Sequence, residues 1–121
     1  MKIDGKEVLI LHLKTKWWQM IKSREKPEEY RRITVYWTKR LVKIIPYIIE
    51  AKNEKESVMF QTMGGTPIFK KFNEAWLLCG YPKLTEIDKI IKWKNPTIEI
   101  REGFPEWGAP ENESVFVIKG I

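Results

Sequence analysis

The chain has 121 residues and a formal net charge of +6, with 43% apolar and 31% charged residues. This length suits one domain with its own core, so we expect a single domain over residues 1–121. The densest apolar stretch, residues 41–49, is interrupted by Lys43 and Pro46 and is too short to span a membrane. The basic charge balance favours a polyanionic partner, RNA or DNA, over a membrane surface.

The start of the chain and its cysteine content indicate the compartment. The apolar run Val8–Leu13 is too short for the core of a signal peptide, and no small-residue cleavage site follows it. Cys79 is the single cysteine, so it cannot form an internal disulfide. We therefore expect a cytoplasmic protein.

The first predicted elements are a buried strand, Glu7–Lys14, and a short helix, Lys16–Lys22, with Thr15 as its N-cap. At helical spacing Trp17 faces the core. This leaves Trp18 as the better ring for stacking on an unpaired base.

A basic segment rich in aromatic residues runs from Lys14 to Lys43. It holds ten of the 22 Lys and Arg residues, three of the 16 Asp and Glu residues, and three of the six tryptophans. Cations attract a phosphate backbone, and flat rings stack on unpaired bases. The segment therefore indicates a nucleic-acid surface; a solvated helix face with a few core aromatics is the alternative.

Three charged side chains fall together after the first helix. Pro27 disfavours helical geometry at Lys26, and the strand Glu28–Ile33 follows, with Glu29 and Arg31 on one of its sides. These residues either converge on one cleft or form an exposed ladder of charges on an edge strand.

A second helix is expected over residues 34–45, before Pro46. Trp37 lies on its inward face, and Lys39 and Arg40 face outward as candidate phosphate contacts.

The second half of the chain predicts further strands and at least one helix. Phe69, Phe72, Trp76 and Cys79 recur at the spacing of one helical face, which predicts a core-facing helix that ends at Gly80. Residues 85–91 form either a short capped helix or the start of a strand. The remaining strands are expected at Ser57–Thr62, Thr97–Arg101 and Ser114–Lys119, with a loop over residues 105–113. This order indicates an α+β fold on a small, mostly antiparallel β-barrel with helices inserted between its strands.

Several sequence features occur in a characteristic order: a strand, a Trp-containing helix, a K-x-x-E-x-R motif at Lys26, Glu29 and Arg31, and a Tyr-Trp-x-x-Arg-Leu segment at residues 36–41. A Pro-Glu-Trp-Gly turn and a last strand end the chain. This order resembles the small single-domain bacterial and phage members of the ASCH family. The family motif begins with Gly, where this chain has Arg24, and residues 64–94 do not match the family pattern.

The resemblance implies a PUA-like barrel, a fold widely used for RNA, with a substrate cleft bordered by the first helix and the motif. Some ASCH proteins hydrolyse the acyl group of N4-acetylcytidine with a Thr nucleophile, a position occupied here by Glu29. Other members are reported to cut RNA. In such a cleft a desolvated Lys26 could act as a general base, Glu29 could hold it charged or act as an acid, and Arg31 could bind a phosphate or carbonyl.

We therefore expect an RNA-binding protein whose cleft engages RNA or a modified nucleoside. Two alternatives are a hydrolase of RNA or N4-acetylcytidine that uses Lys26 and Glu29 as catalytic residues, and a protein–protein adaptor with a basic patch. The only histidine, His12, has no partner at metal-ligand spacing, so we expect no metal and no cofactor. The residues expected to bind RNA or substrate are Arg31, Trp18, Lys22, Arg24, Tyr30, Trp37, Lys39, Arg40, Glu106 and Trp107. The last two either close the cleft from its far side or belong to a rigid turn whose Trp caps the barrel.

Overall fold

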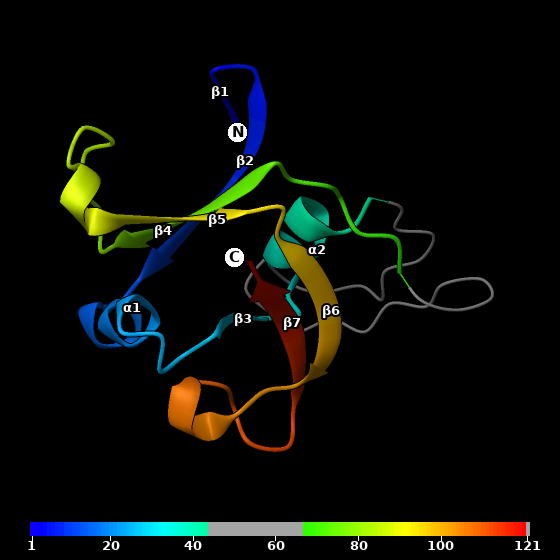
Figure 1. The fold of residues 1–121 in the computed structure, drawn as a ribbon. Coiled ribbons are helices and arrows are strands. Elements are labelled where there is room, and N and C mark those ends of the chain that lie inside the picture. Colours follow the sequence, from blue (N-terminus) through cyan, green and yellow to red (C-terminus); the bar gives the residue numbers. More distant parts are fainter. Residues whose placement is uncertain (44–66, 121) are drawn as a thin grey trace.

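A computed structural model describes residues 1–43 and 67–120 (Figure 1). The predicted strand Ser57–Thr62 lies outside the described residues. Two sheets and two α-helices form an α+β fold, which confirms the expected class. No described helix is long and apolar enough to cross a membrane.

The first sheet has four strands in the order β1-β2-β4-β5. Its strands are β1 (Lys2–Ile3), β2 (Lys6–Leu13), β4 (Glu74–Cys79) and β5 (Ile90–Lys94). At its centre β2 and β4 run parallel, from the pair Val8 and Glu74 to the pair Leu13 and Cys79, whereas the other neighbours are antiparallel. A parallel pair requires a crossover connection, and here α1 (Thr15–Lys22), β3 (Glu28–Arg32) and α2 (Val35–Leu41) all lie in the chain between the two strands.

The second sheet has three antiparallel strands in the order β3-β7-β6. These are β3 (Glu28–Arg32), β7 (Ser114–Lys119) and β6 (Thr97–Glu102). Asn95 and Pro96 form the short turn that leads from β5 in the first sheet to β6 in the second. Within the described residues no strand of one sheet is paired with a strand of the other, so these strands do not close a continuous ladder.

Both helices are short. Helix α1 (Thr15–Lys22) has Lys14 as its N-cap, without a side-chain capping bond, so the predicted Thr15 cap is wrong. Helix α2 (Val35–Leu41) is capped by Thr34, whose hydroxyl accepts a 3.3 Å bond from the Trp37 backbone N–H. This helix ends earlier than expected because Val42 becomes extended and bridges to residue 69.

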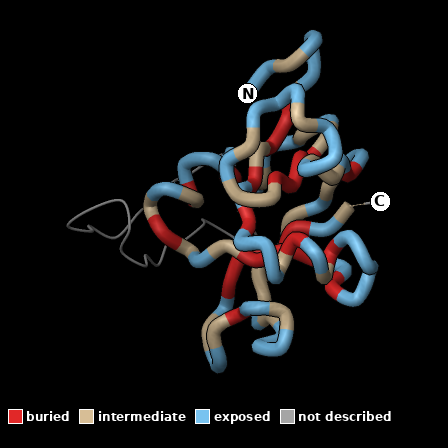
Figure 2. Tube along the Cα trace, turned by 90° about the vertical axis from the view of Figure 1, so that its left-hand side faces the viewer, coloured by how far each residue is buried: buried red, intermediate tan, exposed pale blue. Residues whose placement is uncertain are grey.

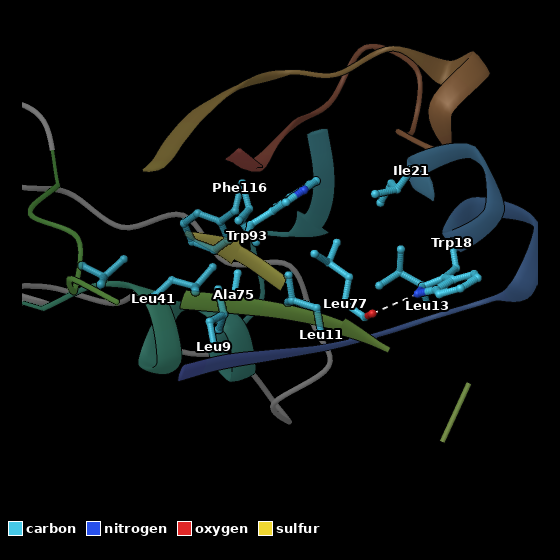
Figure 3. Close-up of a cluster of buried hydrophobic side chains, with 12 residues drawn as sticks. Leu9, Leu11, Leu13, Trp18, Ile21, Leu41, Ala75, Leu77, Trp93 and Phe116 are labelled. Atoms are coloured by element: carbon cyan, nitrogen blue, oxygen red, sulfur yellow. Dashed lines mark hydrogen bonds between the residues drawn. The ribbon is translucent and has the colours of Figure 1, made fainter. Parts of the chain in front are cut away.

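The core lies between the two sheets, and the exposed residues lie mainly on the turns and outer loops (Figure 2). Leu11 and Leu77 of the first sheet face Phe116 of the second (Figure 3). Burying each of these side chains stabilises the fold by roughly 1.5–3 kcal/mol. Trp18 of α1 also enters this cluster, and its Nε1 donates a 2.9 Å bond to the Leu77 carbonyl.

The predicted helix through Trp76 and Cys79 is wrong, because this segment is strand β4. Its residues 75–78 are buried on both faces, so the apolar pattern is continuous and also fits a helical spacing. Residues 87–89 form a single 3-10 turn, and Ile90–Lys94 is a strand, which confirms the strand alternative for that segment.

Candidate functional site

Lys26 is a buried lysine in the loop that joins α1 to β3. Its backbone N–H donates to the Met20 carbonyl at 3.0 Å, which folds the loop back onto the end of α1. Pro27 then starts the extended path into β3. The Lys26 residue is only 1% exposed, although lysine is almost never fully buried without a partner.

The partner is Glu29, which joins Lys26 to Arg31. Lys26 Nζ lies 2.9 Å from Glu29 Oε1, and Arg31 Nη1 lies 2.7 Å from Glu29 Oε2. Glu29 and Arg31 share one side of β3, as the alternation of a strand predicts. Arg31 Nη2 also donates a 2.9 Å bond to the backbone carbonyl of His12 on β2. We call this arrangement the Lys26–Glu29–Arg31 network.

Aromatic rings and a backbone carbonyl enclose the ammonium group. Lys26 Nζ lies 4.9 Å from the centre of the Trp17 ring and 5.1 Å from that of Tyr30, and it donates to the Trp107 carbonyl. Trp107 ends the 3-10 turn η2 (Pro105–Trp107). The next residue, Gly108, has φ +99 and packs so closely on Trp17 that an added Cβ would lie 3.1 Å from the indole. The ammonium is therefore enclosed by two aromatic rings, a backbone carbonyl and the Glu29 carboxylate.

Burial lowers the pKa of Lys26 more than the neighbouring charge of Glu29 raises it. A lysine with a lowered pKa loses its proton more easily than a surface lysine, so more of it is present as the free amine that can serve as a general base. Because the side chain is covered, a ligand reaches the amine only if Trp17 or turn η2 moves aside. Glu106 of that turn is exposed and makes no contact with the network.

A second buried carboxylate, Glu28, supports the same strand from its other face. The Tyr30 hydroxyl donates to Glu28 Oε2 at 2.6 Å, and Arg101 Nη2 donates to Glu28 Oε1 at 2.6 Å. Burial raises the pKa of Glu28, but the bonds from Arg101 and Tyr30 outweigh it, so the net pKa is lowered. Burial and the bond to Glu28 raise the pKa of Tyr30. This cluster fixes Tyr30 against the ammonium of Lys26.

A groove of about 590 Å³ opens beside the buried network. Its cations are Lys22 at the end of α1 and Arg24 in the following loop. Lys92 of β5 also lines it, but the Lys92 ammonium lies 4.3 Å from the Trp76 ring, on the face of the first sheet opposite to Ile91 and Trp93. No acidic side chain is among the described residues that line it. We call it the basic groove; its other lining residues are Ile21, Lys26, Pro27, Ile91, Trp93 and Gly120.

Of the two tryptophans of α1, Trp17 packs against the core as predicted, whereas Trp18 does not have its predicted role. Trp18 is 6% exposed and part of the core, so it offers no free face for a base, and the stacking prediction is wrong. Trp17 is half-buried against the core and covers Lys26. The predicted phase fails because Trp18 and Ile21, three residues apart, are the buried pair on this helix.

The expected contacts on α2 lie apart from the basic groove. The Trp37 ring is 5.1 Å from Arg31 Cζ, so it touches the network from the α2 side. Lys39 and Arg40 instead line a different hollow, of about 630 Å³, between α2 and β2. The sequence predicted that Trp37 contacts RNA, whereas in the structure its ring contacts Arg31 of the same chain.

Three contributors to the site were not predicted as such: Glu28, Arg101 and Lys92. A buried run at the start of β3 could have identified Glu28, but its partner Arg101 is 73 residues away in the sequence. Lys92 joins the groove only because β5 lies beside the end of α1. Among the described residues no cluster of three or more His, Cys, Asp or Glu side chains is arranged to hold a metal ion.

Comparisons with family models, curated protein sequences and solved structures found no match to this chain.

Proposed function

We propose that this chain is an ASCH-type domain that binds RNA or a modified nucleoside at the basic groove. The observation that carries the proposal is the position of the groove, with the cations of Lys22 and Arg24, directly beside the Lys26–Glu29–Arg31 network. The motif Lys, Glu and Arg of the ASCH resemblance are the residues of that network. Lys26 is also shared by the network and the groove.

We also propose that the sheets wrap as a PUA-like barrel. The strand order β2-β4-β5 in the first sheet continues through the turn at Asn95 into β6-β7-β3 in the second. At the open seam, the guanidinium of Arg31 on β3 reaches the His12 carbonyl on β2 at 2.9 Å. A side chain therefore bridges the position where a closed barrel has a backbone ladder.

The groove suits a nucleotide on physical grounds. Cations around its rim attract phosphates, and the apolar side chains of Ile21, Ile91 and Trp93 offer a floor for the less polar parts of a nucleotide. Among the described residues that line the groove none is acidic, so none of these side chains offsets the charges of Lys22 and Arg24. The buried network below holds the loop that carries Arg24 in place.

Binding of a labelled single-stranded RNA, measured by fluorescence anisotropy from 50 to 200 mM salt, tests the proposal. Contacts with two phosphates predict a slope of about −1.4 in log affinity against log salt, which is about a sevenfold loss over this range. The variant Lys22→Ala should weaken binding and flatten the slope. Lys83→Ala removes an exposed lysine outside the groove and is the matched control. Absence of binding, or equal loss in the control, would contradict the proposal.

A hydrolase is the second candidate, because burial lowers the pKa of Lys26 beside Glu29. With Glu29 at the position of the family's hydroxyl nucleophile, water would add to the acyl carbon of N4-acetylcytidine while Lys26 accepts its proton. The C–N bond would then break, and the departing amine would take that proton to give cytidine and acetate. Incubation with N4-acetylcytidine and with RNA, using Lys26→Met as the control, tests this. If wild type and Lys26→Met are equally active, or both inactive, the hydrolase hypothesis is contradicted.

The adaptor alternative predicts a different result. If the basic patch binds an acidic protein and not RNA, wild type should bind RNA no more tightly than the groove variant does. The salt titration with the groove variant therefore separates it from the RNA-binding proposal.

A further inference from the structure

Arg24 has a backbone conformation that arginine rarely adopts. Its φ is +68, in the left-handed region, where a Cβ clashes with the backbone and glycine is favoured. Two hydrogen bonds close the turn around it, from the Arg24 N–H to the Ile21 carbonyl and from the Lys26 N–H to the Met20 carbonyl, both at 3.0 Å. The turn ends α1 in the way that a C-terminal glycine usually does.

The other non-glycine residues with positive φ in the described chain are of a different kind. Asp4, Asn95 and Asn112 belong to the two residue types that tolerate this region best, because their short polar side chains bond locally. Arg24 gains no such compensation, since its guanidinium makes no hydrogen bond or ion pair with any part of the chain that the structure describes. Contacts within the described residues therefore give no reason for arginine at this position.

The location of the side chain supplies a reason. Arg24 lines the basic groove together with Lys22, whose ammonium lies 5.3 Å from the centre of the Trp18 ring. This ring contact restricts where the Lys22 ammonium lies. Arg24 thus adds a planar fork, which suits a phosphate, to a groove that already holds one positioned cation.

We propose that the basic groove takes a phosphate-bearing ligand, a nucleotide and not a free nucleoside, and that Arg24 is the residue that anchors its phosphate. The inference rests on the proposed function and narrows it, because it excludes unphosphorylated N4-acetylcytidine as the preferred ligand. It also assigns the cost of the left-handed backbone at Arg24 to ligand binding, in keeping with strain that persists at functional sites.

The test compares Arg24→Gly with Arg24→Lys and Lys83→Ala. Glycine relieves the backbone strain, so Arg24→Gly should raise the melting temperature by about 2–4 °C. The same variant should bind labelled single-stranded RNA about tenfold more weakly, with its salt slope smaller by about 0.7, the share of one phosphate. Arg24→Lys keeps the charge without the fork and should lose less affinity. The control should match wild type in both measurements.

Competition then identifies the source of the phosphate. Cytidine 5′-monophosphate should displace the labelled RNA at lower concentration than cytidine, whereas inorganic phosphate alone should compete weakly. If only longer RNA competes, the ligand is a phosphate within a chain, and the inference holds in that form. Equal competition by cytidine and its monophosphate would overturn the inference. An Arg24→Gly variant that is more stable than wild type but binds RNA equally well would also overturn it. In that case a steep salt slope for wild type would still support the proposal that the groove binds RNA. If wild type binds no RNA, both proposals fail.

Discussion

Removing the buried ammonium of Lys26 is the sharpest test of the network. In Lys26→Met the side chain keeps a similar length, but Glu29 loses the partner at 2.9 Å while it remains 4% exposed. Breaking a buried pair from one side costs about 3–5 kcal/mol when no other partner is left. Glu29 keeps Arg31 at 2.7 Å and the Tyr30 N–H at 3.0 Å, so we expect the lower end, about 3 kcal/mol. For a chain of this length that is roughly a 12 °C fall in melting temperature.

The chain contains a control with the same distance and different burial. Lys6 Nζ lies 2.9 Å from Glu74 Oε2, but the Lys6 side chain is 57% exposed, so solvent screens the pair. Lys6→Met should leave the melting temperature nearly unchanged. Thermal unfolding followed by circular dichroism measures both variants. Equal shifts in the two would refute the reasoning, because burial would then add nothing to the Lys26 pair.

Three further outcomes follow from other parts of the structure. The pKa of Glu28 is lowered on folding, so this carboxylate stabilises the fold above its ordinary pKa of 4.5, and the stabilisation is lost as the pH falls through the folded pKa. The melting temperature of Glu28→Gln should therefore vary less between pH 6 and pH 3 than that of wild type. Parallel curves of melting temperature against pH would contradict this. Gly103→Ala places a Cβ 2.6 Å from the Tyr30 ring and should destabilise the fold by about 1–3 kcal/mol in a urea titration; an unchanged midpoint would show that the ring moves freely. Trp18→Phe keeps the ring but loses the bond to the Leu77 carbonyl, and we expect a loss of about 1–3 kcal/mol in the same titration, whereas no loss would mean that this carbonyl finds another donor.

Local patterns predicted the network well. The motif places a lysine before a strand and puts Glu29 and Arg31 on one strand face, and the structure joins all three through Glu29. Residues two positions apart on a strand point to the same side, so the prediction for Glu29 and Arg31 required only that β3 be a strand. The conversion of that proximity into a buried cage depends on turn η2, some 80 residues later, which no local pattern contains.

The errors arose where distant segments decide. On one face of strand β4, Ala75 and Leu77 pack into the core between the sheets. On the other face, Trp76 and Leu78 pack into a second apolar cluster with Val8, so the buried residues of β4 have no period of two. Its spacing therefore matched a helix. The phase of α1 was also wrong, since the indole of Trp18 finds its acceptor on Leu77 in β4. In both cases the missing information was which strand neighbours which.

The parallel ladder at the centre of the first sheet has a consequence for folding kinetics. Val8 pairs with Glu74, and Glu28 at the start of β3 pairs with Lys119 at the end of β7. Neither ladder can form until the second half of the chain has left the ribosome, and pairings of such long sequence separation are slow, on the scale of milliseconds to seconds. We expect the nascent first half to expose the apolar face of β2 throughout synthesis, which makes that strand the principal hazard for aggregation before the chain is complete.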